Sequence, residues 1–153
     1  MITIGIDPGV NGGVAVNYGS GVVTYHMPDS AAGMKHLFQN VLSSAFAGPV
    51  YAYVEDVPKF VGVIPGARVA VLFQNFGRLE GVLTGLGIPV TLVRPQAWQK
   101  PLNLGTTRRA SGSTTIWKNK LKAEAQKRFP GVKVTLATAD ALLILDYATK
   151  QTS

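Results

Sequence analysis

Three short apolar segments at the amino terminus, separated only by glycine-containing turns, constrain the fold of this chain more than any other feature. Residues 2–6 carry isoleucine at alternate positions and end before a Pro-Gly turn, and residues 14–18 and 22–26 flank a Gly-Ser-Gly turn. Alternation bounded by glycine and proline predicts β-strands, and a short glycine turn between two such segments predicts a hairpin. We therefore expect the chain to begin with a three-stranded antiparallel meander.

Helix-type and strand-type segments alternate after the meander. Apolar spacing predicts strands over 50–54 and 88–93. It also predicts a helix that begins at 29 or 30 and ends near 46, and further helices over 67–86, 95–100, 114–129 and 138–150. The segments 58–66 and 102–113 are rich in loop-forming residues. This order predicts an α/β fold with a mixed five-stranded sheet flanked by helices, in which helix-connected strands pair parallel. The length of 153 residues suits a single domain over 1–153.

The composition excludes several classes of protein. The chain has no cysteine, which rules out a disulfide scaffold, a thiolate zinc site and a cysteine nucleophile. The amino terminus opens directly into the first strand without the pattern of a signal peptide, and no uncharged apolar segment reaches the ~18 residues that a membrane span needs. We expect a cytoplasmic protein that is neither secreted nor bound to a membrane.

Positive charge is concentrated in one region of the chain. The formal net charge is +7, and the segment 100–128 holds eight basic residues against one acidic residue, Glu124. Such a local excess suits a polyanionic partner, with nucleic acid first and an anionic membrane surface second. The alternative for a single run of lysines is an ordinary solvated helix face.

Three of only eight acidic residues occupy unusual places. Asp7 and Glu55 each end an apolar strand, and Asp140 lies in the first turn of an apolar helix. Each one alone is compatible with ordinary turn or cap chemistry. Together they would meet at one end of the sheet if the two strands are neighbours, and their mutual repulsion would be relieved by a divalent cation such as Mg²⁺ or Mn²⁺.

Clustered carboxylates with divalent metal ions suit phosphodiester hydrolysis. Two metal ions can activate the attacking water and stabilise the departing oxygen, so the protein needs no nucleophile of its own. No residue stands out as a nucleophile, and neither His26 nor His36 lies in a catalytic context.

Several motifs resemble the RuvC family, a branch of the RNase H fold. Ile4-Gly5-Ile6-Asp7-Pro8-Gly9 is similar to the first motif, and the strand that ends on Glu55 and the segment Ala139-Asp140-Ala141-Leu142-Leu143-Ile144 are similar to the second and last. The segment 89–100 resembles phage and organellar junction resolvases of this type. The resemblance covers nearly the whole chain in the right order.

This resemblance implies a homodimeric, metal-dependent endonuclease that resolves four-way (Holliday) DNA junctions. Asp7, Glu55 and Asp140 would be both catalytic residues and metal ligands. An aromatic residue in the loop after the second acid often works at the junction crossover; Phe60 matches it, although it could equally fold back on the core. The residues expected to contact DNA are Lys59, Phe60, Arg94, Lys100, Arg108, Arg109, Lys118 and Lys122.

The sequence departs from the family at one acid. The family usually has a fourth acid about one turn before the last aspartate, where this chain has Thr135-Leu136-Ala137-Thr138. Asp146 lies six residues after Asp140, about 120° around the helix, and cannot easily take the place of the absent fourth acid. Three acids could hold the second metal ion with water, activity could be weak, or the chain could be inactive; the sequence leaves these alternatives open.

Two further features have both a functional and a structural interpretation. Trp98 and Trp117 could stack on bases, but packing in the core is the favoured role. The helix over 67–86 repeats glycine at Gly77, Gly81 and Gly85 and is a candidate dimer surface, or it packs only on its own sheet.

Three rival functions remain. An ATPase or sugar-kinase relative could cradle phosphate with Gly9, Gly12 and Gly13, but such proteins need two domains of this kind. A module that binds junctions or RNA without cutting them would explain the absent acid. A nuclease for RNA–DNA hybrids would use the same basic segment.

Overall fold

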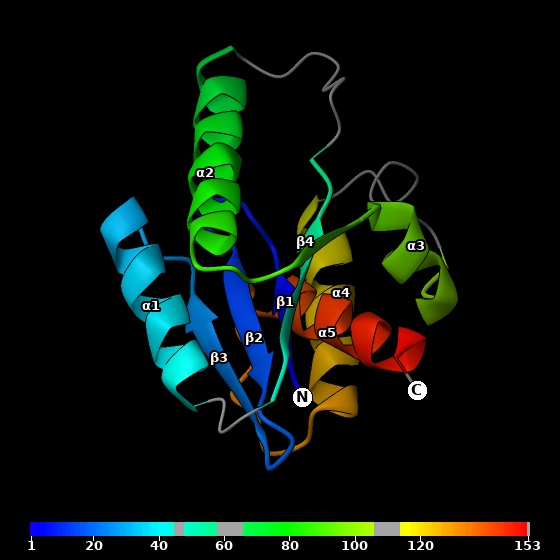
Figure 1. Cartoon of the computed structure of the whole chain (residues 1–153). Helices are drawn as coiled ribbons and strands as arrows, with labels where there is room; N and C mark the ends of the chain where they lie inside the picture. The colour runs from blue at the N-terminus through cyan, green and yellow to red at the C-terminus, as the bar shows by residue number, and fades with distance from the viewer. Residues whose placement is uncertain (45–47, 58–65, 106–113, 153) are drawn as a thin grey trace.

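A mixed five-stranded sheet forms the centre of the protein in this computed structural model, which describes residues 1–44, 48–57, 66–105 and 114–152 (Figure 1). Its strands are β1 Ile2–Ile6, β2 Gly13–Asn17, β3 Val22–His26, β4 Val50–Glu55 and β5 Val90–Val93, in the order β3-β2-β1-β4-β5. The first three strands pair antiparallel, and β4 pairs parallel with β1 and β5. The expected fold class and the amino-terminal meander are confirmed.

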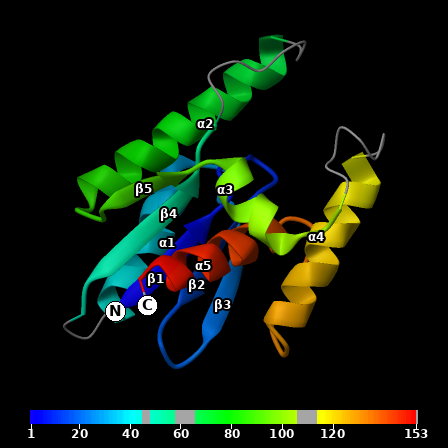
Figure 2. The ribbon, with the colours of Figure 1, turned by 90° about the vertical axis from the view of Figure 1, so that its right-hand side faces the viewer.

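Helices cover both faces of the sheet. They are α1 Ala31–Ser44, α2 Gly66–Gly85, α3 Pro95–Gln99, α4 Thr114–Arg128 and α5 Ala139–Gln151, with a short 3₁₀ helix, η1, at Lys100–Leu102. The two views place α1 and α2 on one face and α5 on the other, with α4 beyond α5 (Figures 1 and 2). No helix within the described ranges has the length and apolar character to cross a membrane.

Each face of the sheet has its own hydrophobic core. Ile4 and Ile6 belong to the core under α1 and α2, together with Phe38 and Leu83. The second core lies under α5 and includes Trp98, Trp117, Leu121, Leu142 and Leu145. Because both faces are covered, every residue of β1 is buried, including Thr3 and Gly5 between the alternating isoleucines.

Gly5 allows α5 to lie directly on β1. A Cβ atom built on Gly5 would come within 2.4 Å of the Ala141 carbonyl oxygen and 2.5 Å of the Leu145 backbone nitrogen. The two backbones can therefore approach this closely only because glycine has no side chain. The residue before Ala141 is Asp140, so this contact fixes the position of the α5 amino terminus relative to β1.

The bounds of most predicted elements differ from the structure by one or two residues, and two of these differences have a local reason. The strand expected over 88–93 begins at Val90, because the Ile88 amide instead donates to the Leu83 carbonyl oxygen and closes the end of α2, with Gly87 at φ 72°. The helix expected over 95–100 ends at Gln99 and continues as η1, because Pro101 has no amide hydrogen for α-helical bonding.

The helix α2 packs on the sheet through one side only. Leu79 and Leu83 are buried, but Val71 is 47% exposed and Phe73 37% exposed, although both have apolar side chains. A Cβ atom added at Gly77, Gly81 or Gly85 would meet nothing within 4 Å. No described segment of the chain covers the glycine face of this helix, and its use as a dimer surface stays a prediction.

Candidate active site

The sheet register brings Asp7 and Glu55 to the same place. Gly5 pairs with Tyr53 and Ile6 with Val54, so the next residues along the two parallel strands are Asp7 and Glu55. Because side chains alternate along a strand, both carboxylates lie on the face opposite Ile6, which is the face covered by α5. Neighbouring parallel strands thus place two acids side by side at their carboxyl ends.

The third acid comes from α5. Asp140 is in the first turn of that helix, and the close contact of Ala141 with Gly5 holds this turn against β1. The three acids therefore lie at the ends of β1 and β4 and at the start of α5. Along the chain, Glu55 follows Asp7 by 48 residues and Asp140 follows Glu55 by 85 residues (55 − 7 and 140 − 55).

The three carboxyl groups lie mostly away from solvent and repel one another. Burial, followed by the nearby charges of Asp7 and Asp140, raises the pKa of Glu55 to about 8. Burial and the charge of Asp7 raise the pKa of Asp140 to about 7, against an opposing effect of Lys118. Burial also raises the pKa of Asp7, although the Gly9 amide and Lys118 both lower it. Carboxyl pKa values raised by burial and by a neighbouring carboxylate are typical of functional sites.

Local hydrogen bonds fix two of these side chains. The Gly9 amide donates to Oδ1 of Asp7 at 3.0 Å, within the turn that ends β1. A Cβ atom on Gly12 would come within 2.7 Å of the Asp7 carboxyl carbon, so Gly12 is needed for packing beside Asp7. The Trp98 indole N–H donates to Oε2 of Glu55 at 2.8 Å. Burial of Trp98 and Trp117 confirms their expected packing role, whereas the bond to Glu55 was not predicted, since no sequence pattern signals it.

The donor set fits a hard divalent cation in its chemistry. Asp7, Glu55 and Asp140 offer only carboxylate oxygens, which Mg²⁺ and Mn²⁺ accept. Among the residues that the structure describes, no three His, Asp or Glu side chains are arranged to enclose one metal ion as they stand. The three acids are thus near enough to interact electrostatically, and side-chain rotation would have to bring their oxygens onto a common cation.

An open cleft of about 630 Å³ leads to Asp7. The turn after β1, the start of α2 and the side chain of Lys118 on α4 line it, and Arg68 of α2 contributes a second cation. The buried Asn75 side chain donates to the Pro8 carbonyl oxygen at 2.7 Å and fastens α2 to that turn. Arg68 was missed by the sequence reasoning, because it lies outside the basic segment and nothing in its neighbourhood suggests an anion site.

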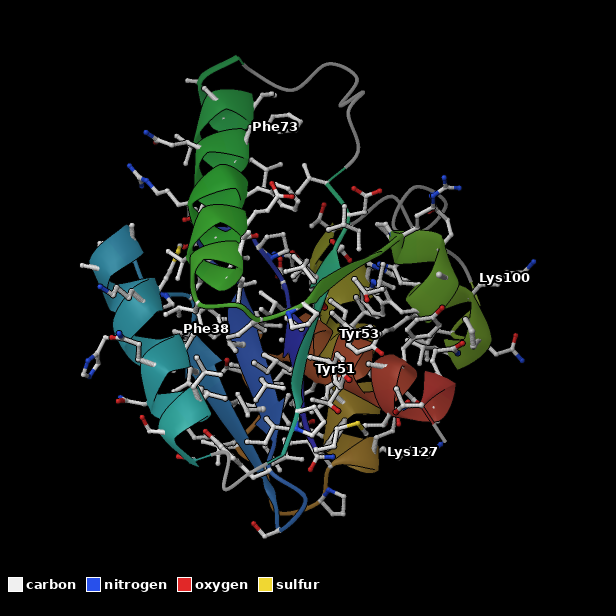
Figure 3. The ribbon with its side chains drawn as sticks, in the orientation of Figure 1. Phe38, Tyr51, Tyr53, Phe73, Lys100 and Lys127 are labelled. Carbon is white, nitrogen blue, oxygen red and sulfur yellow. The ribbon has the colours of Figure 1, made fainter. Side chains whose placement is uncertain are left out.

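The other residues expected to bind DNA are more dispersed. Lys122 is one turn beyond Lys118 on α4 and is partly buried. Lys100 projects outward beside α3 (Figure 3), and Arg94 is exposed in a separate groove with Tyr53 and Tyr147. The remaining predicted contacts lie outside the described residues: Lys59, Phe60, Arg108 and Arg109.

Two of the basic residues in the 100–128 segment already have partners. The Lys120 ammonium donates to the Leu104 carbonyl oxygen at 3.3 Å. Arg128 forms 2.7 Å ion pairs with Glu124 and Asp146. Not all of the positive charge in this segment is therefore free for a polyanion.

Two threonines lie where the family resemblance predicts a fourth acid. Thr135 and Thr138 exchange hydrogen bonds just before α5, and Thr138 is buried. Asp146, the remaining acid of α5, is paired with Arg128 and Lys150. The expectation that Asp146 does not replace the absent acid agrees with these ion pairs.

Replacing Glu55 with glutamine is expected to stabilise the metal-free protein at pH 8 but much less at pH 5. The folded state holds the Glu55 proton more tightly than the unfolded chain, whose pKa is the ordinary 4.5. The stability gained from protonated Glu55 is complete below that value and is lost as the pH rises through about 8. At pH 8, the free energy of unfolding of Glu55→Gln should exceed that of the wild type by about 2 kcal/mol, or roughly 4–8 °C in Tm.

Thermal unfolding in EDTA at both pH values measures this effect. Exposed Glu80 on α2 provides the matched control, and Glu80→Gln should change Tm equally little at pH 5 and pH 8. An equal Tm gain for Glu55→Gln at both pH values would contradict the raised pKa. Added Mg²⁺ should narrow the Tm difference between Glu55→Gln and the wild type at pH 8, because the cation stabilises only the ionised wild-type site.

Comparison with solved structures identifies the architecture. Thermus thermophilus RuvC in complex with a Holliday junction substrate superposes with a TM-score of 0.62 at 16% identity, over 99% of this chain and 96% of that one. The chain has the RuvC fold. A second T. thermophilus RuvC structure gives a TM-score of 0.59 at 17% identity, over 99% of this chain and 97% of that one.

Comparison of the sequence alone finds no relative of this chain. The sequence matches no protein-family model and no curated protein. The yeast mitochondrial Holliday junction resolvase Ydc2 has a TM-score of only 0.38 at 14% identity, over 95% of this chain and 74% of that one. The comparisons establish the RuvC fold, and the expected placement in a phage or organellar branch stays a prediction.

Proposed function

We propose that this protein is a divalent-metal-dependent endonuclease that resolves four-way DNA junctions. The proposal depends chiefly on one observation: three carboxyl groups, at the ends of β1 and β4 and at the start of α5, lie at a single end of the sheet, where the charge of Asp7 raises the pKa of both Glu55 and Asp140. Asp7, Glu55 and Asp140 would be the catalytic residues and would hold Mg²⁺ or Mn²⁺. A cluster of like charges that burial makes unfavourable is tolerable when a cation neutralises it.

The residues around the acids suit a phosphodiester substrate. A bound divalent metal would activate water and stabilise the departing oxygen. The Gly9 amide and the Trp98 indole orient Asp7 and Glu55, and Lys118 lies near enough to Asp7 and Asp140 to lower their pKa values. Lys118 and Arg68 line the cleft beside Asp7, where they can contact the phosphates on either side of the scissile bond.

Branched DNA is the proposed substrate for two reasons. The RuvC structure that this chain resembles is bound to a Holliday junction. The chain also carries a net charge of +7, with Lys118 and Lys122 on neighbouring turns of α4. Phosphate contacts of this type supply affinity without reading sequence.

We also propose a homodimer formed through α2. Symmetric cutting of a four-way junction needs two sites, and the outer face of α2 presents Gly77, Gly81 and Gly85 with open space around each. A second copy could approach the helix backbone closely there and cover the exposed Phe73. Sedimentation velocity at micromolar concentration tests this, and a monomer in the presence of junction DNA would contradict it.

A second candidate function is binding of branched nucleic acid without cleavage. It is favoured by the hydrogen-bonded Thr135 and Thr138 at the place of the expected fourth acid and by the ion pairs of Asp146, which leave three acids for the site. It predicts junction binding with no product in Mg²⁺ or Mn²⁺.

One set of substrates separates these functions. A four-way junction, a linear duplex and an RNA–DNA hybrid would be incubated with the protein in Mg²⁺, Mn²⁺ or EDTA. Junction-selective, metal-dependent nicking supports the proposal, and selective degradation of the hybrid favours an RNase H activity. Tight junction binding without product in either metal supports the binding module.

Two lysines on α4 should affect the reaction differently. Lys122→Ala should weaken junction binding and reduce the slope of log affinity against log salt by about 1, because it removes one phosphate contact. Lys118→Ala should also lower the cleavage rate of bound junction by roughly 10-fold, since Lys118 lies beside the acids. Salt-dependent binding assays and single-turnover cleavage measure the two effects.

Lys127→Ala is the matched control for these substitutions. Lys127 is an exposed lysine of the same helix, nine residues beyond Lys118 and away from the cleft (Figure 3). It should alter neither the salt slope nor the rate. Equal losses of junction affinity and cleavage rate from all three substitutions would mean that α4 contributes only general positive charge.

A further inference from the structure

The bond between Trp98 and Glu55 joins a residue of the hydrophobic core to the acid cluster. Trp98 is only 1% exposed, and its Nε1 lies 2.8 Å from Oε2 of Glu55. An indole N–H must find an acceptor when it is buried, and a backbone carbonyl would satisfy it. Here the acceptor is a carboxylate at the end of β4, which is one of the three acids of the candidate site.

The position of the donor is fixed by the packing around it. Trp98 belongs to the core beneath α5, with Trp117 and Leu121 of α4 and Leu142 of α5. Pro95 starts α3, and Pro101 prevents the α-helix from continuing past Gln99, so the Trp98 backbone is held in a short element that has little freedom. The indole is therefore a rigid donor, whereas Glu55 is a side chain with three rotatable bonds.

The same cluster includes residues of α4 and α5, two elements that carry charged groups of the site. Trp117 immediately precedes Lys118 on α4, and Leu142 lies two residues after Asp140 on α5. Trp98 thus lies where β4, α4 and α5 meet, and its hydrogen bond fixes the orientation of Glu55 relative to the other two elements. The bond occupies Oε2, so Oε1 is the oxygen left without this donor.

We propose that Trp98 is a positioning residue for cation binding: its indole N–H fixes the orientation of the Glu55 carboxylate so that one oxygen faces the cation shared with Asp7 and Asp140. This inference rests on the proposed nuclease function. Partners that orient metal-binding carboxylates typically contribute 10–100-fold to metal affinity or activity. The effect of losing the bond should therefore exceed any effect of the small change in packing.

Trp98→Phe tests the proposal, with Trp117→Phe as its matched control. Both substitutions exchange indole for phenyl in one core, but only the first removes the donor to Glu55. Trp98→Phe should weaken Mn²⁺ binding in isothermal titration calorimetry by about 10-fold and lower cleavage of bound junction by a similar factor. Trp117→Phe should leave both within about 2-fold. Junction affinity in EDTA should be unchanged for both variants.

The outcomes separate the positioning role from a structural one. If both variants lose Mn²⁺ affinity and Tm equally, Trp98 acts only through packing and the proposal is overturned. It is also overturned if Trp98→Phe matches the wild type. If the wild-type protein cuts no substrate, the nuclease proposal fails, while the calorimetric comparison still decides whether Trp98 supports cation binding.

A second measurement covers the case in which Trp98→Phe does not fold. The chain has two tryptophans, so Trp117→Phe leaves a single indole N–H signal in a ¹H–¹⁵N NMR spectrum, that of Trp98. Titration with Mg²⁺ should shift this signal, and Glu55→Gln should shift it in the absence of metal and abolish its response to Mg²⁺. A signal insensitive to both changes would show that the indole is not coupled to the site.

Discussion

Replacing Asp7 with asparagine is expected to lower the rate of junction cleavage by at least about 1000-fold while leaving junction affinity within a factor of about two. Asp7 is the acid whose charge raises the pKa of both Glu55 and Asp140, so it is central to the cluster. Loss of a central anionic ligand from a catalytic metal site should raise the barrier by ~4 kcal/mol, which corresponds to this factor.

The asparagine variant is nearly isosteric, which makes the test specific. Its amide oxygen can still accept the bond that the Gly9 amide donates to Oδ1 of Asp7, so the turn after β1 should be preserved. The exposed Asp29, just before α1, is the control, and Asp29→Asn should cleave at the wild-type rate. Normal nicking by Asp7→Asn would show that the residue is not catalytic, and lost binding would show that the substitution disturbs more than the metal site.

Replacing Gly5 with alanine is expected to destabilise the protein by about 3 kcal/mol, or roughly 6–12 °C in Tm. The new methyl group would meet backbone atoms of Ala141 and Leu145 at 2.4 and 2.5 Å, and neither can move unless α5 moves as a whole. Urea and thermal unfolding measure the loss. The α5 shift should also move Asp140 away from Asp7, so cleavage by the folded fraction should decrease.

Gly21 provides the matched glycine. A Cβ atom there would meet nothing within 4 Å, and its φ is not positive, so Gly21→Ala should change stability by less than about 1 kcal/mol in either direction. If Gly5→Ala is as stable as Gly21→Ala, α5 does not lie directly on β1, and the placement of Asp140 beside the strand ends would be wrong.

The two tests examine different levels of the same site. The Asp7 substitution tests the chemistry of the cluster with the fold intact, whereas the Gly5 substitution tests the packing that brings the third acid to the other two. Loss of activity in both with loss of stability only in Gly5→Ala is the pattern expected if α5 positions Asp140.

Patterns of short range were readable from the sequence. Alternating isoleucines predicted β1, glycine turns predicted the hairpin, and the order of strands and helices predicted the mixed sheet. Because parallel neighbours end at the same edge, the positions of Asp7 and Glu55 at two strand ends predicted that they would meet. Contacts between distant residues that do not follow from strand pairing were not readable, and Arg68 in the cleft and the ion pair of Arg128 with Asp146 are examples.

By itself, the sequence determined the fold class, the strand ends that carry acids and the helix that carries the lysines, because these follow from periodicity and from residue type along a few neighbouring positions. Only the tertiary structure decided that Gly5 admits α5 against β1, that Trp98 donates to Glu55, and that the glycine face of α2 is uncovered by the described residues. Each of these depends on the distance between atoms of elements that are remote in sequence, and packing of the whole chain sets that distance.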